Sequence, residues 1–154
     1  MRSLWKLATA MLCAATLLAA DADSKAALKD TAQKLIMESR TTREMAMQIA
    51  EQLRRSADTG AIRDQIATLE QHAASIRQLI ADLESKGNEL TARQRQQLET
   101  ARKVAEILNV FIENKKQMLA SVTSPRDREQ VRYQAIGVAQ RAEMIEKTIS
   151  KLGL

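Results

Sequence analysis

Residues 61–86 read AIRDQIATLEQHAASIRQLIADLESK, and apolar residues recur along them at alternating spacings of four and three. This seam consists of Ile62, Ile66, Leu69, Ala73, Ile76, Ile80 and Leu83. Alternation of four and three puts the apolar residues on one stripe of a helix, as in helices that pack at about 20°. The stretch therefore predicts a long amphipathic helix with one buried face.

Three further segments, residues 24–57, 92–122 and 125–152, carry the same spacing. The last has the seam Val131, Ala135, Val138, Ala142, Ile145, Ile149 and Leu152. The third has Leu98, Ala101, Ala105, Leu108, Ile112, Lys115, Leu119 and Val122. The first is weaker, with Leu28, Ala32, Leu35, Ser39, Thr42, Ala46, Ile49 and Leu53. With the helix over 61–86, the pattern predicts four helices.

The breaks between these segments contain residues that end and begin helices. Residues 58–60 (Asp-Thr-Gly) separate the first two, and Gly87 suits a left-handed cap after Lys86. Thr91 and Gln94 match a capping box, and residues 124–127 offer a serine cap followed by proline and aspartate. Such short connections force consecutive helices to run antiparallel.

The resulting prediction is an all-α, antiparallel up-down-up-down four-helix bundle. Aromatic residues make up 2% of the chain, which has four Gly and one Pro, and this argues against an all-β domain. The alternative is two helical hairpins that pair only in a dimer.

The first 22 residues have the anatomy of a secretory signal peptide. Arg2 and Lys6 precede an uncharged apolar run over residues 7–20, and Ala-Asp-Ala at 20–22 offers a cleavage site. The apolar run is shorter than the roughly 20 residues of a spanning helix. We therefore expect residues 1–22 to be removed, together with Cys13, and residues 23–154 to form the bundle domain of a periplasmic or secreted protein without a stable membrane span.

The composition offers little for catalysis or nucleic-acid binding. One His and one Cys give no zinc cluster or disulfide framework, and no glycine-rich phosphate loop or paired metal signature occurs. Loss of Arg2 and Lys6 with the signal segment lowers the formal net charge from +5 to +3, or to +4 if Asp21 is also lost, which is too mildly basic for a dedicated nucleic-acid binder. We expect a protein that is not an enzyme, with no catalytic residues, no metal site and no cofactor.

His72 supports an alternative function, because haem-binding bundles use an axial histidine with a methionine or a second histidine on a facing helix. Methionines are plentiful: Met37, Met45, Met47, Met118 and Met144 follow the signal segment. The alternative is a non-covalent haem-binding electron carrier in which His72 binds the cofactor. Methionines also fill gaps in small-residue cores or form adaptable binding surfaces, and we prefer that interpretation.

Residues 90–94, Leu-Thr-Ala-Arg-Gln, resemble the L-T-x-x-Q motif of the Spy/CpxP-type periplasmic chaperones, which are small exported helical proteins. Those proteins typically carry the motif twice, and residues 122–125 are a distant echo of it. The resemblance implies chaperone activity. The same residues also form an ordinary capping box, which explains them without kinship.

Three polar residues fall on predicted seams. A buried unpaired ammonium is costly, so we expect Lys115 to reach solvent near a helix end or to pair with a carboxylate. For Ser39 and Thr42 we expect the role that polar seam residues often have, which is to set the register between helices.

The connections 58–60 and 123–124 lie at the same end of the predicted bundle, and cations exceed carboxylates there. We predict that this end binds an anionic partner through Arg54, Arg55, Lys115, Lys116, Arg126 and Arg128. The sequence thus predicts an exported, non-catalytic interaction protein, chaperone-like or an adaptor. Its partner would be another protein, an anionic surface or a second copy in a homodimer.

Overall fold

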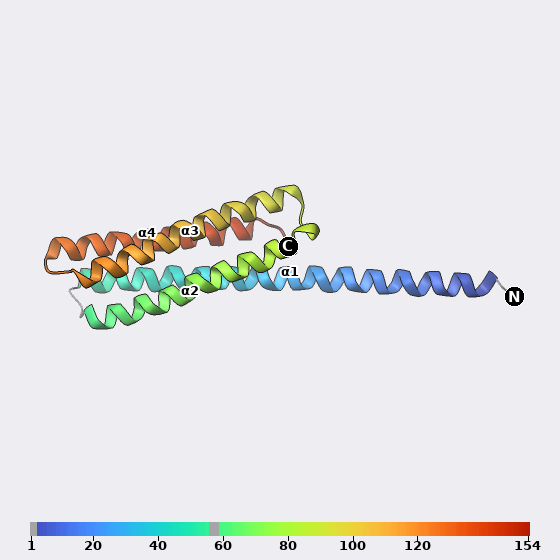
Figure 1. The fold of residues 1–154 in the computed structure, drawn as a ribbon, viewed down its shortest axis with the longest axis horizontal. Coiled ribbons are helices and arrows are strands. Elements are labelled where there is room, and N and C mark those ends of the chain that lie inside the picture. Colours follow the sequence, from blue (N-terminus) through green and yellow to red (C-terminus); the bar gives the residue numbers. More distant parts are fainter. Residues whose placement is uncertain (1–2, 56–58) are drawn as a thin grey trace.

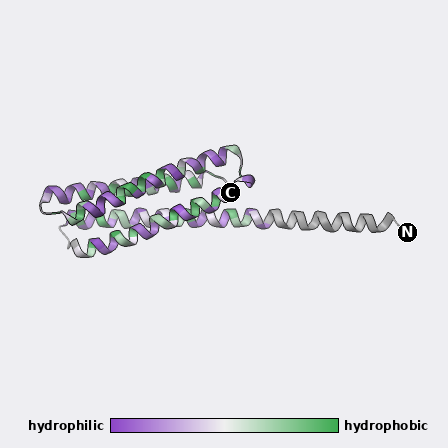
Figure 2. Cartoon of the chain, in the orientation of Figure 1, coloured by the Kyte–Doolittle hydropathy of each residue, from purple (hydrophilic) through white to green (hydrophobic). Residues whose placement is uncertain are grey.

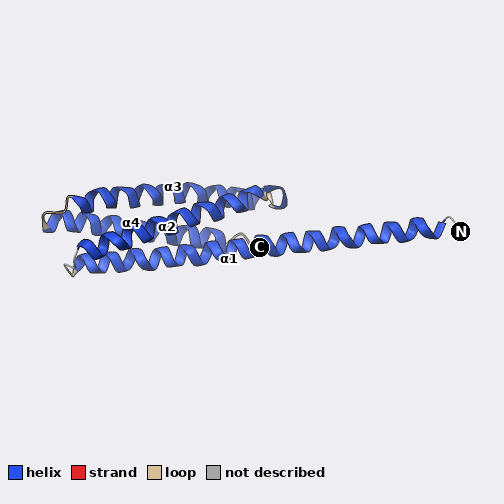
Figure 3. Ribbon diagram, turned by 60° about the horizontal axis from the view of Figure 1, so that its bottom comes forward, coloured by secondary structure: helices blue, strands red, loops and turns tan. Residues whose placement is uncertain are grey.

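The computed structural model describes residues 3–55 and 59–154, with side chains for residues 23–55 and 60–154. Its helices are α1 (Ser3–Arg54), α2 (Thr59–Ser85), α3 (Ala92–Ala120) and α4 (Pro125–Ser150), with a 3-10 turn, η1 (Gly87–Glu89), before α3. The described part contains no strand (Figure 3). The predicted all-α class is confirmed.

The helices form a ring in which consecutive helices are antiparallel neighbours (Figure 1). Helix α1 packs against α2 and α4, and α3 packs against the same two helices. Because α4 closes the ring onto α1, the two hairpins pair within one chain, and the four-helix bundle is the observed arrangement. We call the end with the connections 55–58 and 121–124 the loop end, and the end with η1 and residue 154 the far end.

The N-terminal half of α1 extends beyond the other three helices (Figure 1). The predicted signal peptide, residues 1–22, has its side chains outside the described residues, and its cleavage stays a prediction. Across the described residues, none of the helices has the combined length and apolarity needed to cross a membrane.

The core follows the predicted seams. Every seam residue in the four predicted lists is buried except Val122, which is partly buried at the loop end. Figure 2 shows this pattern in the hydropathy colours, in which hydrophobic and hydrophilic residues alternate along each helix of the bundle. The seams are rich in alanine, so the helices approach closely around a thin core.

Ser39 and Thr42 are buried, but neither sets the register as expected. The Ser39 hydroxyl donates to the Leu35 carbonyl at 2.8 Å, and the Thr42 hydroxyl donates to the Glu38 carbonyl at 2.8 Å. Both acceptors belong to α1 itself. These hydroxyls are satisfied one turn back along their own helix, so they carry no information about a neighbouring helix.

Two of the predicted helix caps are confirmed. Thr91 accepts a hydrogen bond from the Gln94 amide while the Gln94 side chain accepts one from the Thr91 amide, and Ser124 with Asp127 repeats this at α4. The prediction of a left-handed cap at Gly87 is wrong. Among the described glycines, Gly153 has a positive φ, of 66°, whereas Gly87 begins η1.

Replacing Ser124 with Ala should lower the free energy of unfolding by about 1 kcal/mol, because one amide at the start of α4 loses its acceptor. Urea unfolding followed by circular dichroism measures this change. Ser121→Ala is the matched control, since Ser121 is exposed and donates to the Met118 carbonyl without capping an amide. Equal losses in both variants would contradict a capping role.

Candidate functional site

Helices α1 and α4 carry several apolar side chains that are exposed at the surface. Met47 on α1 is 50% exposed, and Tyr133 and Met144 on α4 are 62% and 52% exposed. Ile136, one turn from Tyr133, is partly buried against the core. We call Met47, Tyr133, Ile136 and Met144 the α1–α4 face. Large side chains that remain this exposed on a stable helix are not explained by folding.

A groove runs along this face between α1 and α4. It has a volume of about 410 Å³. Its walls are formed by Arg43, Met47, Ile136, Ala139, Gln140 and Glu143. The floor is apolar and the rim carries both signs of charge, which is the composition of many protein-binding surfaces.

Ion pairs hold the two helices of this face together. Glu146 Oε1 on α4 accepts a hydrogen bond from Arg40 at 2.8 Å, and Glu146 Oε2 forms an ion pair with Arg43 at 3.1 Å; both arginines belong to α1. The Glu146 side chain is 13% exposed, so this pair of contacts is partly shielded from solvent. These ion pairs join α1 and α4 one to two helical turns beyond the apolar part of the groove. They therefore hold its two walls in place.

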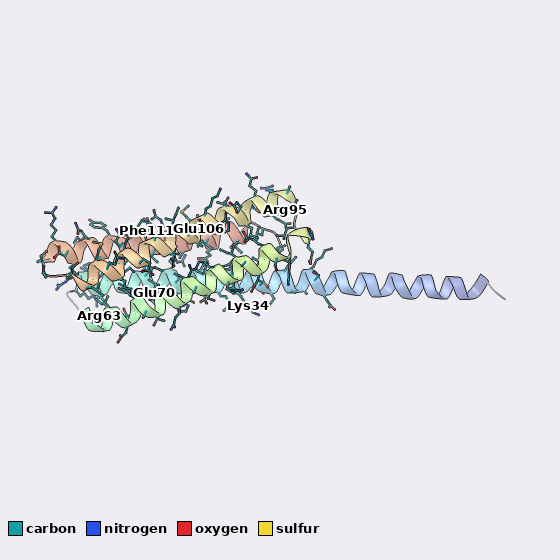
Figure 4. All side chains as sticks on the ribbon, viewed as in Figure 1. Lys34, Arg63, Glu70, Arg95, Glu106 and Phe111 are labelled. Carbon is teal, nitrogen blue, oxygen red and sulfur yellow. The ribbon has the colours of Figure 1, made fainter. Side chains whose placement is uncertain are left out.

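On the other side of α4, Phe111 of α3 packs into a notch at Gly137 (Figure 4 labels Phe111). A Cβ added at Gly137 would lie 2.4 Å from the Phe111 ring. The Arg141 guanidinium lies over that ring, 4.3 Å from its centroid. Glycine at this position therefore brings α3 and α4 close together and leaves the ring covered by a cation.

Three of the six cations of the predicted basic end form ion pairs among the described residues. Arg54 and Arg55 both bind Glu51, each at 2.7 Å, and hydrogen bonds from Arg54 and then Arg55 lower the pKa of Glu51 to about 2. Lys116 donates a hydrogen bond to Glu70 Oε2 on α2 at 3.2 Å, and this hydrogen bond raises the Lys116 pKa. These contacts neutralise much of the positive charge that the sequence places there.

Arg126 and Arg128 lie in the first turn of α4, as the sequence predicts. Arg126 is exposed and has no ion pair among the described residues, whereas Arg128 is partly buried. Asp58, which also belongs to this end in sequence, lies outside the described residues. The structure thus brings the predicted cations to one end, where Arg54, Arg55 and Lys116 are exposed but paired, Arg126 is exposed, Arg128 is partly buried and Lys115 is buried.

Lys115 contradicts both sequence-based expectations. Its side chain is completely buried, and its Nζ atom has no hydrogen-bond partner. It neither reaches solvent nor pairs with a carboxylate in the described part of the chain, and it cannot be a surface contact of the folded bundle. Burial lowers the pKa of the Lys115 ammonium to about 7.

His72 lies between α1 and α2 and is partly exposed. Its Nδ1 atom is 2.7 Å from a carboxylate oxygen of Glu38 on α1. Met37, Met47 and Met144 are at least half exposed, and Met45 and Met118 pack against the core. Within the described residues, no group of three or more His, Cys, Asp and Glu side chains could hold a metal ion. Haem binding by His72 stays a prediction, which a Soret band on haem addition, lost in His72→Ala, would support.

Sequence reasoning did not identify the α1–α4 face. It named the methionines but could not say which of them lie near Tyr133 and Ile136. Part of this information is in the sequence, since the spacings between Tyr133, Ile136 and Met144 place all three residues on the same half of a helix surface. The missing information was which helix packs beside α4.

Comparisons with protein-family models, curated proteins and solved structures found no significant match to this chain. The residues that resemble the Spy/CpxP motif begin α3, where Thr91 and Gln94 serve as its capping box. The fold is an antiparallel four-helix bundle, and its function has to be inferred from its own surface.

Proposed function

We propose that this chain is an exported, non-catalytic helical bundle that binds protein partners on the α1–α4 face. The observation that carries the proposal is the groove lined by Met47 and Ile136. On α4, the exposed Tyr133 comes three residues before Ile136, and the exposed Met144 directly follows Glu143 of the groove wall. Methionine side chains are flexible and polarisable, so they adapt to partners of different shape, and tyrosine is enriched in the centres of protein interfaces.

The charged rim favours a protein partner over a small apolar ligand. Arg43 and Glu143 flank the apolar floor of the groove and give its rim charges of both signs, although each also forms an ion pair within the chain, Arg43 with Glu146 and Glu143 with Lys147. An amphipathic segment that buries its apolar side chains against Met47 and Ile136 would keep its polar groups near this rim. An unfolded or partly folded client meets the same requirement, which is the basis for proposing chaperone-like action.

The paired arginines argue against the basic end as the main partner site. Because Glu51 already binds Arg54 and Arg55, an anionic partner would have to displace an internal carboxylate. Replacing Arg54, Arg55, Arg126 and Arg128 together with Gln should therefore leave partner binding intact.

Light scattering of reduced, aggregating insulin tests the proposal directly. We expect the purified protein to suppress the aggregation, and the double variant Met47→Glu, Ile136→Glu to lose most of this effect because two carboxylates would lie in the apolar groove. Val110→Glu is the matched control, since Val110 is 55% exposed on α3. A wild-type protein without effect, or equal losses in both variants, would contradict binding on this face.

Export is tested separately, because it does not depend on the partner. Mass spectrometry of the purified protein should find a mature N-terminus near residue 21 or 23. An intact Met1 in the membrane fraction would contradict cleavage.

A further inference from the structure

Lys115 is the least expected residue of the core. It occupies a seam position of α3, five residues before that helix ends at Ala120, and none of its surface is exposed. Among the residues whose side chains the structure describes, none places an acceptor within hydrogen-bond distance of its Nζ atom, and Asp58 lies outside them. An ammonium in this position has lost its water without gaining a partner, which is among the most costly arrangements in a protein interior.

Apart from Glu70 Oε1 and Glu146 Oε2, which take part in ion pairs, the other buried side-chain polar atoms without a hydrogen-bond partner among the described residues lie at the same end of the bundle. They come from each of the other three helices: Gln52 Oε1 of α1, Gln65 Oε1 of α2, and Arg128 Nε and Gln134 Oε1 of α4. All of them lie within about three turns of the loop end. Opening this end would give water to each of these groups, and closing it leaves them unsatisfied.

The charged residues on the surrounding helices do not compensate Lys115. At its level, α1 carries Glu51, α2 carries Arg63, Asp64 and Glu70, and α4 carries Asp127, Arg128, Glu129 and Arg132. Four of the five carboxylates have other partners: Glu51 binds Arg54 and Arg55, Glu70 binds Lys116, Glu129 binds Arg132, and Asp127 caps α4. The fifth, Asp64, is exposed. Figure 4 labels Arg63 and Glu70 on α2, on the loop-end half of the bundle.

We propose that proton uptake by the Lys115 amine opens the loop end of the bundle, so that apolar core is exposed there in acid and covered in alkali. The step is a simple protonation, in which the neutral amine accepts a proton from solvent and becomes an ammonium that requires water. Because Lys115 is close to the helix ends, separation of the last turns is enough to hydrate it. The far end keeps its seam.

The lowered pKa of Lys115, about 7, puts this event in the range that an exported protein meets. The proposal goes beyond the proposed function, since opening is a property of the chain alone and needs no partner. If the loop end does not open in acid, the separate proposal that partners bind on the α1–α4 face is not affected.

Hydrogen exchange of the full chain, measured by mass spectrometry at pH 5.5 and pH 9 and corrected for intrinsic rates, tests the proposal. Between pH 9 and pH 5.5, protection around residues 46–55, 60–69, 108–120 and 125–135 should fall by on the order of tenfold to a hundredfold. Protection at the far end, residues 28–35 and 142–149, should change little. In Lys115→Met the loop end should stay protected at both pH values.

Two control variants exclude other sources of pH dependence. Lys116→Met removes the neighbouring, exposed lysine, and His72→Gln removes the one imidazole of the sequence. Both should open at low pH as the wild type does. The proposal is overturned if wild-type protection at the loop end does not depend on pH, if Lys115→Met keeps the dependence, or if both ends lose protection together.

A measurement on the wild type covers the case in which Lys115→Met does not fold. The ¹³Cε resonance of Lys115 should titrate near neutrality in the intact protein. Titration above pH 10, where an exposed lysine titrates, would overturn the proposal even without a variant.

Discussion

Lys115→Met is expected to raise the free energy of unfolding at pH 7 by on the order of 3 kcal/mol. The lysine amine is completely buried and has no partner, so the folded state bears the cost of desolvating it. Methionine has a similar length and an unbranched apolar chain that fills the same space. The exchange therefore keeps the packing and removes the cost.

The pH dependence of this difference has a definite sign. The unfolded chain keeps its Lys115 proton up to the ordinary pKa of 10.5, whereas the folded chain loses it near 7. Between these values the unfolded state holds more protons, so wild-type stability rises as the pH increases from 7 to 10.5. Below pH 7 both states are protonated, and the variant's advantage is largest and constant.

Urea unfolding at pH 6, 8 and 10 for both proteins measures the difference. The difference in unfolding free energy between Lys115→Met and the wild type should become smaller at each higher pH. Lys116→Met, which removes a 57% exposed lysine and its surface ion pair, should differ from the wild type by less than about 1 kcal/mol. A gap that widens with pH, or a variant less stable than the wild type, would contradict the buried amine.

The fold could be predicted from the sequence because the information is periodic. Spacings of four and three determine which side of each helix is buried, and short connections leave antiparallel packing as the arrangement of neighbours. Even the weak seam of α1 was predicted correctly, since Ser39 and Thr42 are buried at their seam positions. What their hydroxyls bond to was not predictable, because spacing does not distinguish an acceptor on the same helix from one across the interface.

The site was harder to predict because it depends on which helices lie side by side and on the rotation of each. The pairs Glu38 with His72, and Arg40 and Arg43 with Glu146, join residues that are far apart in sequence. Nothing in local spacing indicates such pairs. The burial of Lys115 was visible as a seam position, but the general cost of an unpaired ammonium led to the opposite expectation.

Ile76→Ala should lower the free energy of unfolding by about 3 kcal/mol, within the range found for removing a large aliphatic side chain from a core. Ile76 is completely buried in the middle of α2. The buried seams of the four helices contain many alanines, which have no side-chain freedom with which to fill a cavity, so the core should relax little. In a core lined by many alanines, the loss of one large aliphatic side chain is therefore expected to lower the free energy of unfolding more than its size alone suggests.

Ile107→Ala is the matched control for this prediction. Ile107 is 47% exposed on α3, so the same change there removes little buried surface and slightly improves helix propensity. Thermal and urea unfolding should place Ile107→Ala within about 0.5 kcal/mol of the wild type. Similar losses of unfolding free energy in the two variants would contradict a closed seam on α2. Removing an Ile from an exposed helix surface and removing one from the seam can cost the same only if water already enters the seam.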